Sequence, residues 1–500
     1  MKIGQYILAL DQGTTSSRAI LFNSYGQIVS EGQKEFPQIY PQPGYVEHNP
    51  VQILESQLFA IREAINQAEI SVEEIAAIGI TNQRETTVAW DAKTGIPICN
   101  AIVWQCRRTA ELCEELKAEG WEPYIREKTG LIIDAYFAGT KMKWILDHVP
   151  EARILAAEGR LRFGTVDSWL IYSLTEGERF VTDVTNACRT MLFDIHTLQW
   201  DQKLLERLGI PKSALPEVVE SSGVIGMCHS SVLGREIPIA GIAGDQHAAL
   251  FGQCCFEKGM TKNTYGTGCF VLMNTGETPV ESKNGLLTTI GWSIGGKVTY
   301  ALEGSAFNAG SAINWLRDGL HLIQKPADAD RMAESVEDNG GVYFVPAFTG
   351  LGAPYWDMYA RGSILGLTRG ATDAHLARAV LESIAFESWD LFHAMEEDAG
   401  VTIPQLRVDG GASRSRFLMQ LQSTLLGCPV CRPACLETTA LGAAMLAGLA
   451  TGVWDSMEEL SAIWKPQTTY TPGDPSGNSL LLSKWHRAVA RCRQWEESEM

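Results

Sequence analysis

The sequence has little positive charge for its length. Lys and Arg number 41 among 500 residues, against 59 Asp and Glu, and the formal net charge is −18. Nucleic-acid binding usually requires a basic face that displaces counterions, so this balance argues against a protein that binds DNA or RNA. Phosphorylated small molecules are still possible ligands, because a few local donors can hold a phosphate group.

Cysteine and long apolar runs are also scarce. The 12 cysteines are irregularly spaced, which argues against a disulfide framework and favours a reducing compartment. Residues 1–10 lack the apolar core and cleavage site of a signal peptide. No apolar stretch reaches the roughly 18 residues that a membrane span needs. We therefore expect a cytoplasmic protein without a membrane span.

The remaining pattern is that of an α/β globular chain. Hydrophobic residues make up 45%, and 500 residues predict two to four domains, most simply two. Strand-like runs such as residues 5–10 alternate with helical periodicity such as that of residues 51–68. No low-complexity linker divides the chain. We place a boundary near residue 253, which gives domains 1–253 and 254–500 with a small-molecule site between them.

The second half of the chain continues the alternation. Strand signals cluster over residues 261–300, and helical character is expected from Glu303 to Leu320. A long amphipathic helix is predicted over residues 373–397, and two further helices over residues 413–426 and 438–450.

Polar, glycine-containing turns follow three of the predicted strands, over residues 10–17, 241–246 and 408–413. Backbone amides and hydroxyls in the first turn suit phosphate oxygens, and its Asp11 could hold Mg²⁺ through water. Asp245 in the second turn could accept a proton from a substrate hydroxyl. The paired glycines of the third turn let a flat base and ribose lie against the backbone. Each turn by itself is also compatible with a polar turn or a helix N-cap, at Ser413 in the third.

A charged pair and three aromatic residues are candidates for binding a polyol. Arg84 could donate to a hydroxyl oxygen while Glu85 accepts from the hydroxyl hydrogen. From these two residues alone, a surface ion pair is the better interpretation. Trp104, Tyr136 and Phe270 could provide apolar walls for a carbon backbone, and each is otherwise an ordinary core aromatic.

Two patterns that resemble ligand sites are better explained otherwise. Residues 291–297 match the beginning of a phosphate-binding loop, but Val298 stands where Ser or Thr should bind Mg²⁺. The flanking segments read as strands, so we expect a hairpin there. Cys428 and Cys431 form a C-x-x-C pair at a predicted helix-to-strand joint, and no second pair lies at metal-ligand spacing.

Together, long segments of the chain resemble the FGGY carbohydrate kinases, and within them the members that phosphorylate glycerol. The segments that carry the resemblance are residues 9–19, 75–87, 100–110, 138–148, 241–253, 262–270, 345–357 and 407–420. The stretch after about residue 465 resembles the family least. The resemblance implies two actin-like (ribonuclease H-like) lobes with an interlobe cleft. It also implies ATP-dependent phosphorylation of glycerol to sn-glycerol 3-phosphate with Mg²⁺.

The resemblance also implies roles for individual residues. Asp245 would be the general base, and Asp11 would help to hold Mg²⁺. The residues expected to bind glycerol are Arg84, Glu85, Trp104, Tyr136, Asp245, Gln246 and Phe270. The residues expected to bind ATP or ADP are Thr14, Thr15, Ser16 and Arg18 in the first lobe and Thr267, Gly310, Asn314, Gly411 and Ser415 in the second.

Three positions depart from the family's pattern. His247 and Asn314 stand where Gln is usual or common, and Ser415 stands where Asn is usual. Two other functions also remain open, a kinase of the same family for another polyol or ketose and an actin-like ATP switch without kinase activity. The family pattern favours a homo-oligomer, a dimer or a tetramer, and a monomer is the alternative.

Overall fold

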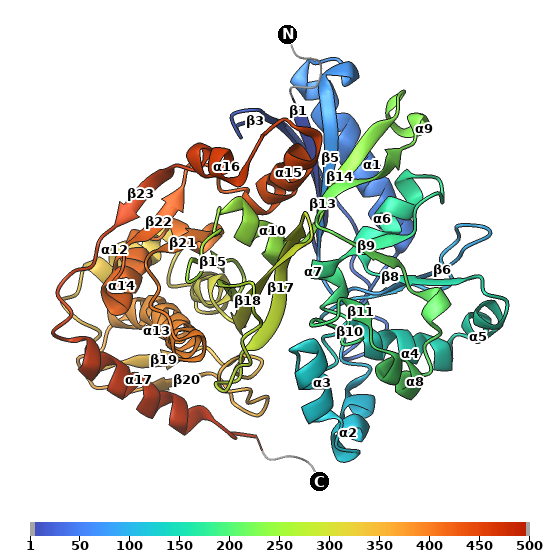
Figure 1. The fold of residues 1–500 in the computed structure, drawn as a ribbon. Helices are drawn as coiled ribbons and strands as arrows, with labels where there is room; N and C mark the ends of the chain where they lie inside the picture. The colour runs from blue at the N-terminus through green and yellow to red at the C-terminus, as the bar shows by residue number, and fades with distance from the viewer. Residues whose placement is uncertain (1–5, 497–500) are drawn as a thin grey trace.

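The computed structural model describes residues 6–496, which form two lobes side by side (Figure 1). The first lobe contains a six-stranded mixed sheet with the order β13-β14-β5-β1-β2-β3. Its strands are β1 (Tyr6–Gln12), β2 (Ser16–Asn23), β3 (Ile28–Glu35), β5 (Ile75–Asn82), β13 (Ser222–Cys228) and β14 (Ile237–Gly244). Strands β1, β5 and β14 are parallel, so their carboxyl ends lie at one edge of the sheet.

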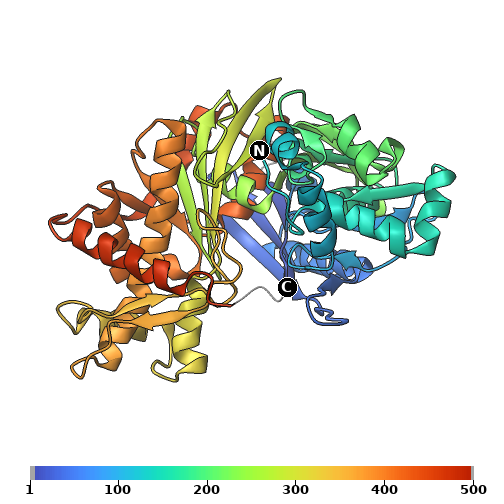
Figure 2. The same ribbon diagram turned by 90° about the horizontal axis from the view of Figure 1, so that it is seen from below.

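The second lobe contains a seven-stranded mixed sheet with the order β17-β18-β16-β15-β21-β22-β23. Its strands are β15 (Thr261–Tyr265), β16 (Cys269–Gly276), β17 (Leu287–Ile294), β18 (Lys297–Ala306), β21 (Leu406–Asp409), β22 (Val430–Pro433) and β23 (Pro466–Tyr470). Strands β15, β21 and β22 are parallel, so the turns that follow β15 and β21 are neighbours. The lobes also lie side by side when viewed from below (Figure 2).

Short strands form small ladders outside the two sheets. They are β4 (Glu47–His48), β6 (Val88–Asp91), β7 (Ala101–Ile102), β8 (Leu161–Gly164), β9 (Val181–Asp183), β10 (Phe193–Asp194), β11 (Gln199–Trp200), β12 (Glu217–Val219), β19 (Tyr343–Val345) and β20 (Ser363–Leu365). Most of them belong to the segment between β5 and β13, which packs around an apolar core of its own.

The helices of the first half are α1 (Pro50–Ala68), α2 (Ala110–Ala118), α3 (Glu122–Thr129), α4 (Ala138–His148), α5 (Pro150–Ala157), α6 (Val166–Leu174), α7 (Val184–Ala187), α8 (Gln202–Leu208), α9 (Ser230–Leu233) and α10 (Asp245–Gly252). The first residue of helix α1 is determined by local sequence signals. The Asn49 side chain accepts from the Val51 amide at 2.9 Å, and Pro50 supplies a preset backbone angle at the first position.

The helices of the second half are α11 (Gly310–Asn314), α12 (Pro326–Glu334), α13 (Asp373–Ala399), α14 (Arg416–Leu426), α15 (Thr438–Thr451), α16 (Met457–Ile463) and α17 (Asn478–Cys492). Helix α15 packs on β5 and β14, so a segment of the second half of the chain covers the first sheet. Helix α10 contacts both α15 and the second sheet, and Figure 1 shows it between the lobes. Gly442 and Gly252 let α10 and α15 cross closely, because a β-carbon at Gly442 would overlap the Ala248 carbonyl.

The two faces of the first sheet are buried differently. In β1, Leu8 and Leu10 pack with α1 and α6, whereas Ile7 and Ala9 pack with α10 and α15. This alternation follows from the two-residue period of a strand. Both faces are apolar, so the polar residues of β1, β5 and β14 are confined to the strand ends.

Most of the predicted elements are confirmed, including the strands at both ends of the first glycine turn, α1, α13 and α15. The expected helix from Glu303 to Leu320 is wrong in its first part. Strand β18 continues to Ala306, and only the short α11 and one π-helical turn follow. Residues 303–306 pair with β16, from Leu272↔Glu303 to Cys269↔Ala306, so sheet pairing outweighs helical periodicity there.

Three smaller predictions are also settled. Residues 291–297 form the β17–β18 hairpin, in which Gly295 and Gly296 have φ of +59° and +79°. The C-x-x-C pair lies at the predicted joint between α14 and β22. The N-cap expected at Ser413 is wrong, because Ser415 caps α14 through its side chain. No helix among residues 6–496 is long and apolar enough to cross a membrane.

Candidate active site

The predicted catalytic and polyol-binding residues meet at the carboxyl edge of the first sheet. Asp11 is the penultimate residue of β1, Arg84 and Glu85 follow β5, and Asp245 follows β14 as the first residue of α10. These three strands are parallel neighbours, which brings together residues that are 234 positions apart between Asp11 and Asp245.

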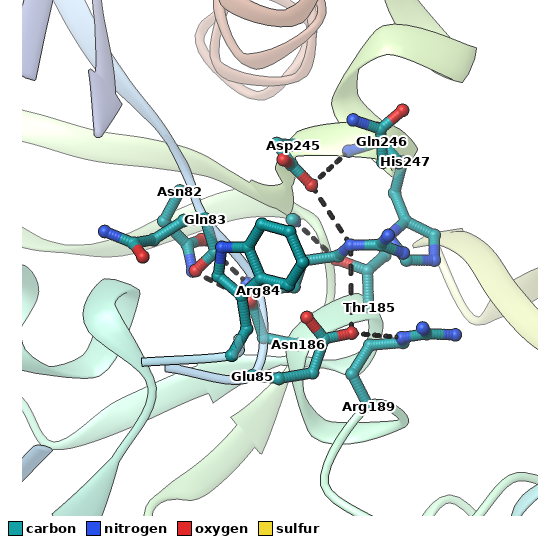
Figure 3. A network of polar contacts seen from close by, with 12 residues as sticks. Asn82, Gln83, Arg84, Glu85, Thr185, Asn186, Arg189, Asp245, Gln246 and His247 are labelled. Atoms are coloured by element: carbon teal, nitrogen blue, oxygen red, sulfur yellow. Dashed lines mark hydrogen bonds and ion pairs between the residues drawn. The ribbon is translucent and has the colours of Figure 1, made fainter. Parts of the chain in front are cut away.

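Arg84 holds the proposed base. Its Nε lies 3.0 Å from Asp245 Oδ1, and the Asp245 side chain is 33% exposed whereas that of Arg84 is 2% exposed (Figure 3). Asp245 Oδ1 also accepts from the Gln246 amide at 2.7 Å. One oxygen of Asp245 is therefore held in place, while the carboxylate still faces solvent.

The charged pair at the end of β5 is not a surface ion pair. Arg84 and Glu85 are 3% and 1% exposed, and Arg84 Nε is 4.0 Å from Glu85 Oε1. Glu85 Oε1 instead accepts from Arg189 Nε at 2.7 Å. Burial raises the pKa of Glu85, and the guanidiniums of Arg84 and Arg189 oppose that rise.

A polar scaffold behind the site supports the strand ends. The side-chain amides of Asn82 and Asn186 exchange two hydrogen bonds of 3.0 and 3.1 Å. The Thr185 hydroxyl accepts from the Gly244 amide at 2.9 Å (Figure 3). Asp183 caps α7 and accepts from the Asn186 amide at 3.0 Å. These contacts orient the ends of β5 and β14, because every group in the scaffold is buried and paired.

Two of the predicted aromatic walls contact each other. The rings of Trp104 and Tyr136 meet edge to face with centroids 5.7 Å apart. Trp104 Nε1 donates to Thr14 Oγ1 at 3.0 Å, which links this predicted polyol residue to the first glycine turn. Phe270 is half-buried in β16 of the second lobe, where it pairs with Thr264 of β15.

Gln246 and His247 follow Asp245 on α10. Lys262 Nζ donates to Gln246 Oε1 and, at 3.0 Å, to Thr264 Oγ1. Burial lowers the pKa of Lys262 to about 8, although Asp409 and Asp245 oppose that shift. His247 is fully buried, and its Nε2 lies 3.0 Å from Thr289 Oγ1.

Asp11 and Arg18 face each other across β1 and β2. Arg18 Nη1 donates to Glu437 Oε2 at 2.8 Å, which connects the first sheet to the start of α15. Burial raises the pKa of Asp11 to about 7, Arg18 lowers it, and the nearby carboxylates of Glu437 and Asp245 raise it further. The carboxylates of Asp11 and Asp245 are therefore close enough to repel each other.

The predicted nucleotide residues of the second lobe lie on two neighbouring turns and on α11. Thr267 is exposed in the turn after β15, and the Gly310 amide donates to the Gly266 carbonyl of that turn at 2.9 Å. Gly411 and Asn314 are also exposed. Ser415 differs, because its hydroxyl donates to Asp330 Oδ1 at 2.5 Å and accepts from the Leu418 amide at 3.0 Å.

Comparison with known protein families identifies the family of this chain. Residues 6–252 match the N-terminal domain of the FGGY family of carbohydrate kinases, and residues 261–451 match its C-terminal domain. The chain belongs to the FGGY carbohydrate kinases. The resemblance inferred from the sequence motifs is thus confirmed, as is the α/β fold with a mixed sheet in each lobe.

Several relatives of this FGGY kinase are similar over their whole length. A glycerol kinase of Symbiobacterium thermophilum is 60% identical over 491 residues, which cover 98% of this chain and 99% of the relative. Glycerol kinase 2 of Thermotoga maritima is 59% identical over 494 residues, which cover 99% of this chain and 100% of the relative.

Solved structures support the same placement. The crystal structure of Plasmodium falciparum glycerol kinase with ADP has a TM-score of 0.93 and 38% identity, and the match covers 97% of this chain and 98% of the other. A ligand-bound xylulose kinase from Lactobacillus acidophilus has a TM-score of 0.88 at 24% identity, covering 97% of this chain and 98% of that chain, which shows a shared fold.

Three charged residues at the site of this FGGY kinase were not predicted from the sequence. They are Arg189, Lys262 and Glu303. Glu303 was assigned to the start of a helix, although a lone carboxylate inside the apolar run of β18 is a signal of a buried polar contact. Arg189 and Lys262 had no such signal, because their partners come from distant segments.

Proposed function

We propose that this protein is a glycerol kinase, which transfers the γ-phosphoryl group of MgATP to a terminal hydroxyl of glycerol. The full-length similarity to glycerol kinases from two bacteria supports this activity. The observation that carries the mechanism is the partly exposed carboxylate of Asp245 at the strand ends. Its Oδ1 is held 3.0 Å from Nε of the buried Arg84. An alcohol that binds there would meet both an acceptor and a donor.

In the proposed in-line transfer, the hydroxyl oxygen of glycerol forms a bond to the γ-phosphorus. The bond from that phosphorus to the β–γ bridging oxygen breaks, and ADP leaves with the electron pair. Asp245 takes the hydroxyl proton, a contribution of roughly 10²–10⁴-fold for general base catalysis. The other groups position the reactants, because phosphoryl transfer has a loose transition state.

Glycerol has three hydroxyls and an apolar carbon backbone, and the site offers matching groups. We assign hydrogen bonding of the hydroxyls to Arg84, Glu85 and Gln246, together with Tyr136. Trp104 and Phe270 would pack on the carbons, and Lys262 fixes the amide oxygen of Gln246, which leaves the amide nitrogen to donate.

The nucleotide would lie between the glycine turns of the two lobes. We assign its phosphates to Thr14, Thr15, Ser16, Arg18 and Thr267, and its base and ribose to the surface formed by Gly310, Asn314, Gly411 and Ser415. The exposure of Thr15, Thr267 and Gly411 supports this assignment, since these groups face solvent and are free to contact a ligand.

Asp11 fits the expected metal. Its carboxylate oxygens are the kind of ligand that Mg²⁺ prefers, and Asp11 is partly buried. A bound cation would stabilise the anionic form of this carboxylate, whose pKa is raised to about 7. Mg²⁺ held by Asp11 would neutralise charge on the phosphates. It would also reduce the repulsion between Asp11 and Asp245.

We also propose a domain boundary near residue 253, between α10 and β15. A cytoplasmic location is supported by the 12 cysteines, all of which are unpaired. A homo-oligomer, dimer or tetramer, remains our expectation for the assembly.

A coupled assay of ADP release tests the function. Glycerol should stimulate ATP turnover strongly, whereas pentuloses and longer polyols should not. Asp245→Asn should lower kcat by at least about 100-fold and leave ADP binding within about twofold. Asp373→Asn is a matched control, because Asp373 also begins a helix and accepts from the next amide, at 2.9 Å, but is exposed on α13.

The outcomes separate the alternatives. Preferential turnover of a pentulose or another polyol would assign a different substrate within the family. ATP turnover that no polyol changes would instead indicate an actin-like switch. Near-normal turnover in Asp245→Asn would refute the assignment of the base.

A further inference from the structure

Four charged side chains form a buried cluster behind the proposed polyol site. Arg84, Glu85 and Arg189 come from the first lobe, and Glu303 comes from β18 of the second. Each is at most 3% exposed. Two guanidiniums and two carboxylates balance one another in charge, and Figure 3 shows the first-lobe members converging beneath Asp245.

Glu303 fixes the plane of the Arg84 guanidinium. Arg84 Nη1 donates to Glu303 Oε2 at 2.6 Å, and Arg84 Nη2 donates to Glu303 Oε1 at 2.9 Å. This two-point contact is the strongest geometry for an arginine and a carboxylate. It turns the Arg84 Nε toward Asp245 Oδ1 and leaves one further N–H on each terminal nitrogen for another acceptor.

Glu303 also anchors Arg189. Arg189 Nη2 donates to Glu303 Oε1 at 3.3 Å, while Arg189 Nε donates to Glu85 Oε1 at 2.7 Å. The guanidinium lies over the ring of Tyr136, at 5.6 Å from its centroid. Its Nη1 is buried and has no hydrogen-bond partner among the residues that the structure describes. Arg189 thus connects Glu303 to two residues that are predicted to bind the polyol, Glu85 and Tyr136.

The electrostatics agree with this geometry. Burial by itself would raise the pKa of Glu303, but Arg189 and Arg84 outweigh it and hold that pKa well below its usual range. Removal of one member of a buried ion pair leaves an uncompensated charge, which is strongly unfavourable. Without the Glu303 carboxylate, the two guanidiniums would compete for Glu85 and Asp245, and the hydrogen-bonding groups offered to the polyol would change.

We propose that Glu303 is a positioning residue for the polyol site, a carboxylate from the second lobe that orients Arg84 directly and Glu85 through Arg189. Polyol affinity therefore depends on a residue of the lobe opposite to the one that carries the hydroxyl-binding side chains. The inference rests on the proposed function, because it assumes that the hydroxyls bind at Arg84 and Glu85.

Initial-rate kinetics of Glu303→Gln test the proposal. The KM for glycerol should rise by about tenfold or more, the effect of losing one charge-assisted hydrogen bond, while the KM for ATP stays within about twofold. Glu387→Gln is the matched control. Glu387 is a buried carboxylate, 2% exposed, on α13 of the same lobe, and no arginine is among the groups that shift its pKa. Both of its KM values should equal those of the wild type.

A second variant addresses misfolding. If Glu303→Gln does not fold, Glu303→Gln/Arg189→Gln removes one charge of each sign and should recover the wild-type unfolding midpoint. Its KM for glycerol should nevertheless remain raised by about tenfold, because Arg84 and Glu85 have lost their anchors. A purely structural role for Glu303 would instead bring the glycerol KM back together with the stability.

Three results would overturn the positioning role. The first two are a folded Glu303→Gln with an unchanged glycerol KM and a double variant with a wild-type glycerol KM. The third is an equal increase in the KM values for glycerol and ATP, because it indicates general damage. The wild-type protein is measured in parallel. Absence of glycerol turnover in the wild type would overturn the proposed function itself, so the two failures are distinguishable.

Discussion

Replacement of Gly411 by Ala should weaken ATP binding without harming the fold. Gly411 begins the 3₁₀ turn after β21, and its backbone does not have the positive φ of Gly410. A β-carbon at Gly411 would meet no atom within 4 Å. In the ligand-free protein the added methyl group therefore clashes with nothing. The lower conformational entropy of the unfolded chain should stabilise the folded variant by about 0.4–1 kcal/mol.

The magnitude of the effect on ATP follows from packing. If the ribose or base lies against Gly411, the added methyl group occupies space that the nucleotide needs. Insertion of a methyl group into a well-packed contact costs about 1–3 kcal/mol, which corresponds to a rise of about 5- to 150-fold in the KM for ATP. The KM for glycerol should stay near its wild-type value, because the residues proposed to bind the polyol lie on the first lobe and on β16.

The assay is initial-rate kinetics with ATP varied at saturating glycerol, combined with calorimetric titration of ADP. Gly223→Ala is the matched control, since Gly223 in β13 also has an ordinary φ and open space at its β-carbon. Its KM for ATP should not change. A folded Gly411→Ala variant with wild-type affinity for both nucleotides would refute the placement of the nucleotide on this turn.

Three further results are expected. Gly410→Ala should lower the unfolding temperature in scanning calorimetry, because Gly410 has φ of +82° and its β-carbon would lie 2.6 Å from the Tyr265 carbonyl. Trp104→Phe should raise the glycerol KM by about two- to tenfold in initial-rate assays, since it loses the hydrogen bond to Thr14 but keeps a ring beside Tyr136, and Trp104→Ala should raise it more. Glu387→Gln should unfold at higher urea concentration than the wild type at pH 9 and equally at pH 4. Burial raises the pKa of Glu387 from 4.5 to about 8. The contribution of protonated Glu387 to the free energy of unfolding is therefore complete below pH 4.5 and is lost as the pH rises through 8. The loss amounts to up to about 5 kcal/mol.

The local pattern of the sequence was sufficient for most of the fold. Strands β1, β5 and β14 are apolar runs that end in polar turns, and both properties can be read from neighbouring residues. Helix α13 was predicted nearly to its ends, because its 27 residues keep one helical period. The β17–β18 hairpin was recognised from Gly295-Gly296 and from the missing hydroxyl at Val298, which are also local signals.

Predictions failed where tertiary contacts outweigh local preference. Glu303 lies in β18 although the segment that follows it reads as a helix, since a strand there completes the second sheet. The Arg84–Glu85 pair reads as a surface ion pair, but its partners Arg189 and Glu303 lie 104 and 219 positions from the residues that they contact. No local pattern contains that information.

The sequence by itself determined the family, the α/β class and the chemical character of each strand end, because these depend on residue types over short stretches of chain. The tertiary structure decided which charges neutralise one another. Parallel pairing of β1, β5 and β14 brings Asp11, Arg84 and Asp245 to one edge, and packing of the second sheet adds Glu303 beneath them. A buried charge is stable only with a partner, and the position of that partner is a property of the folded chain.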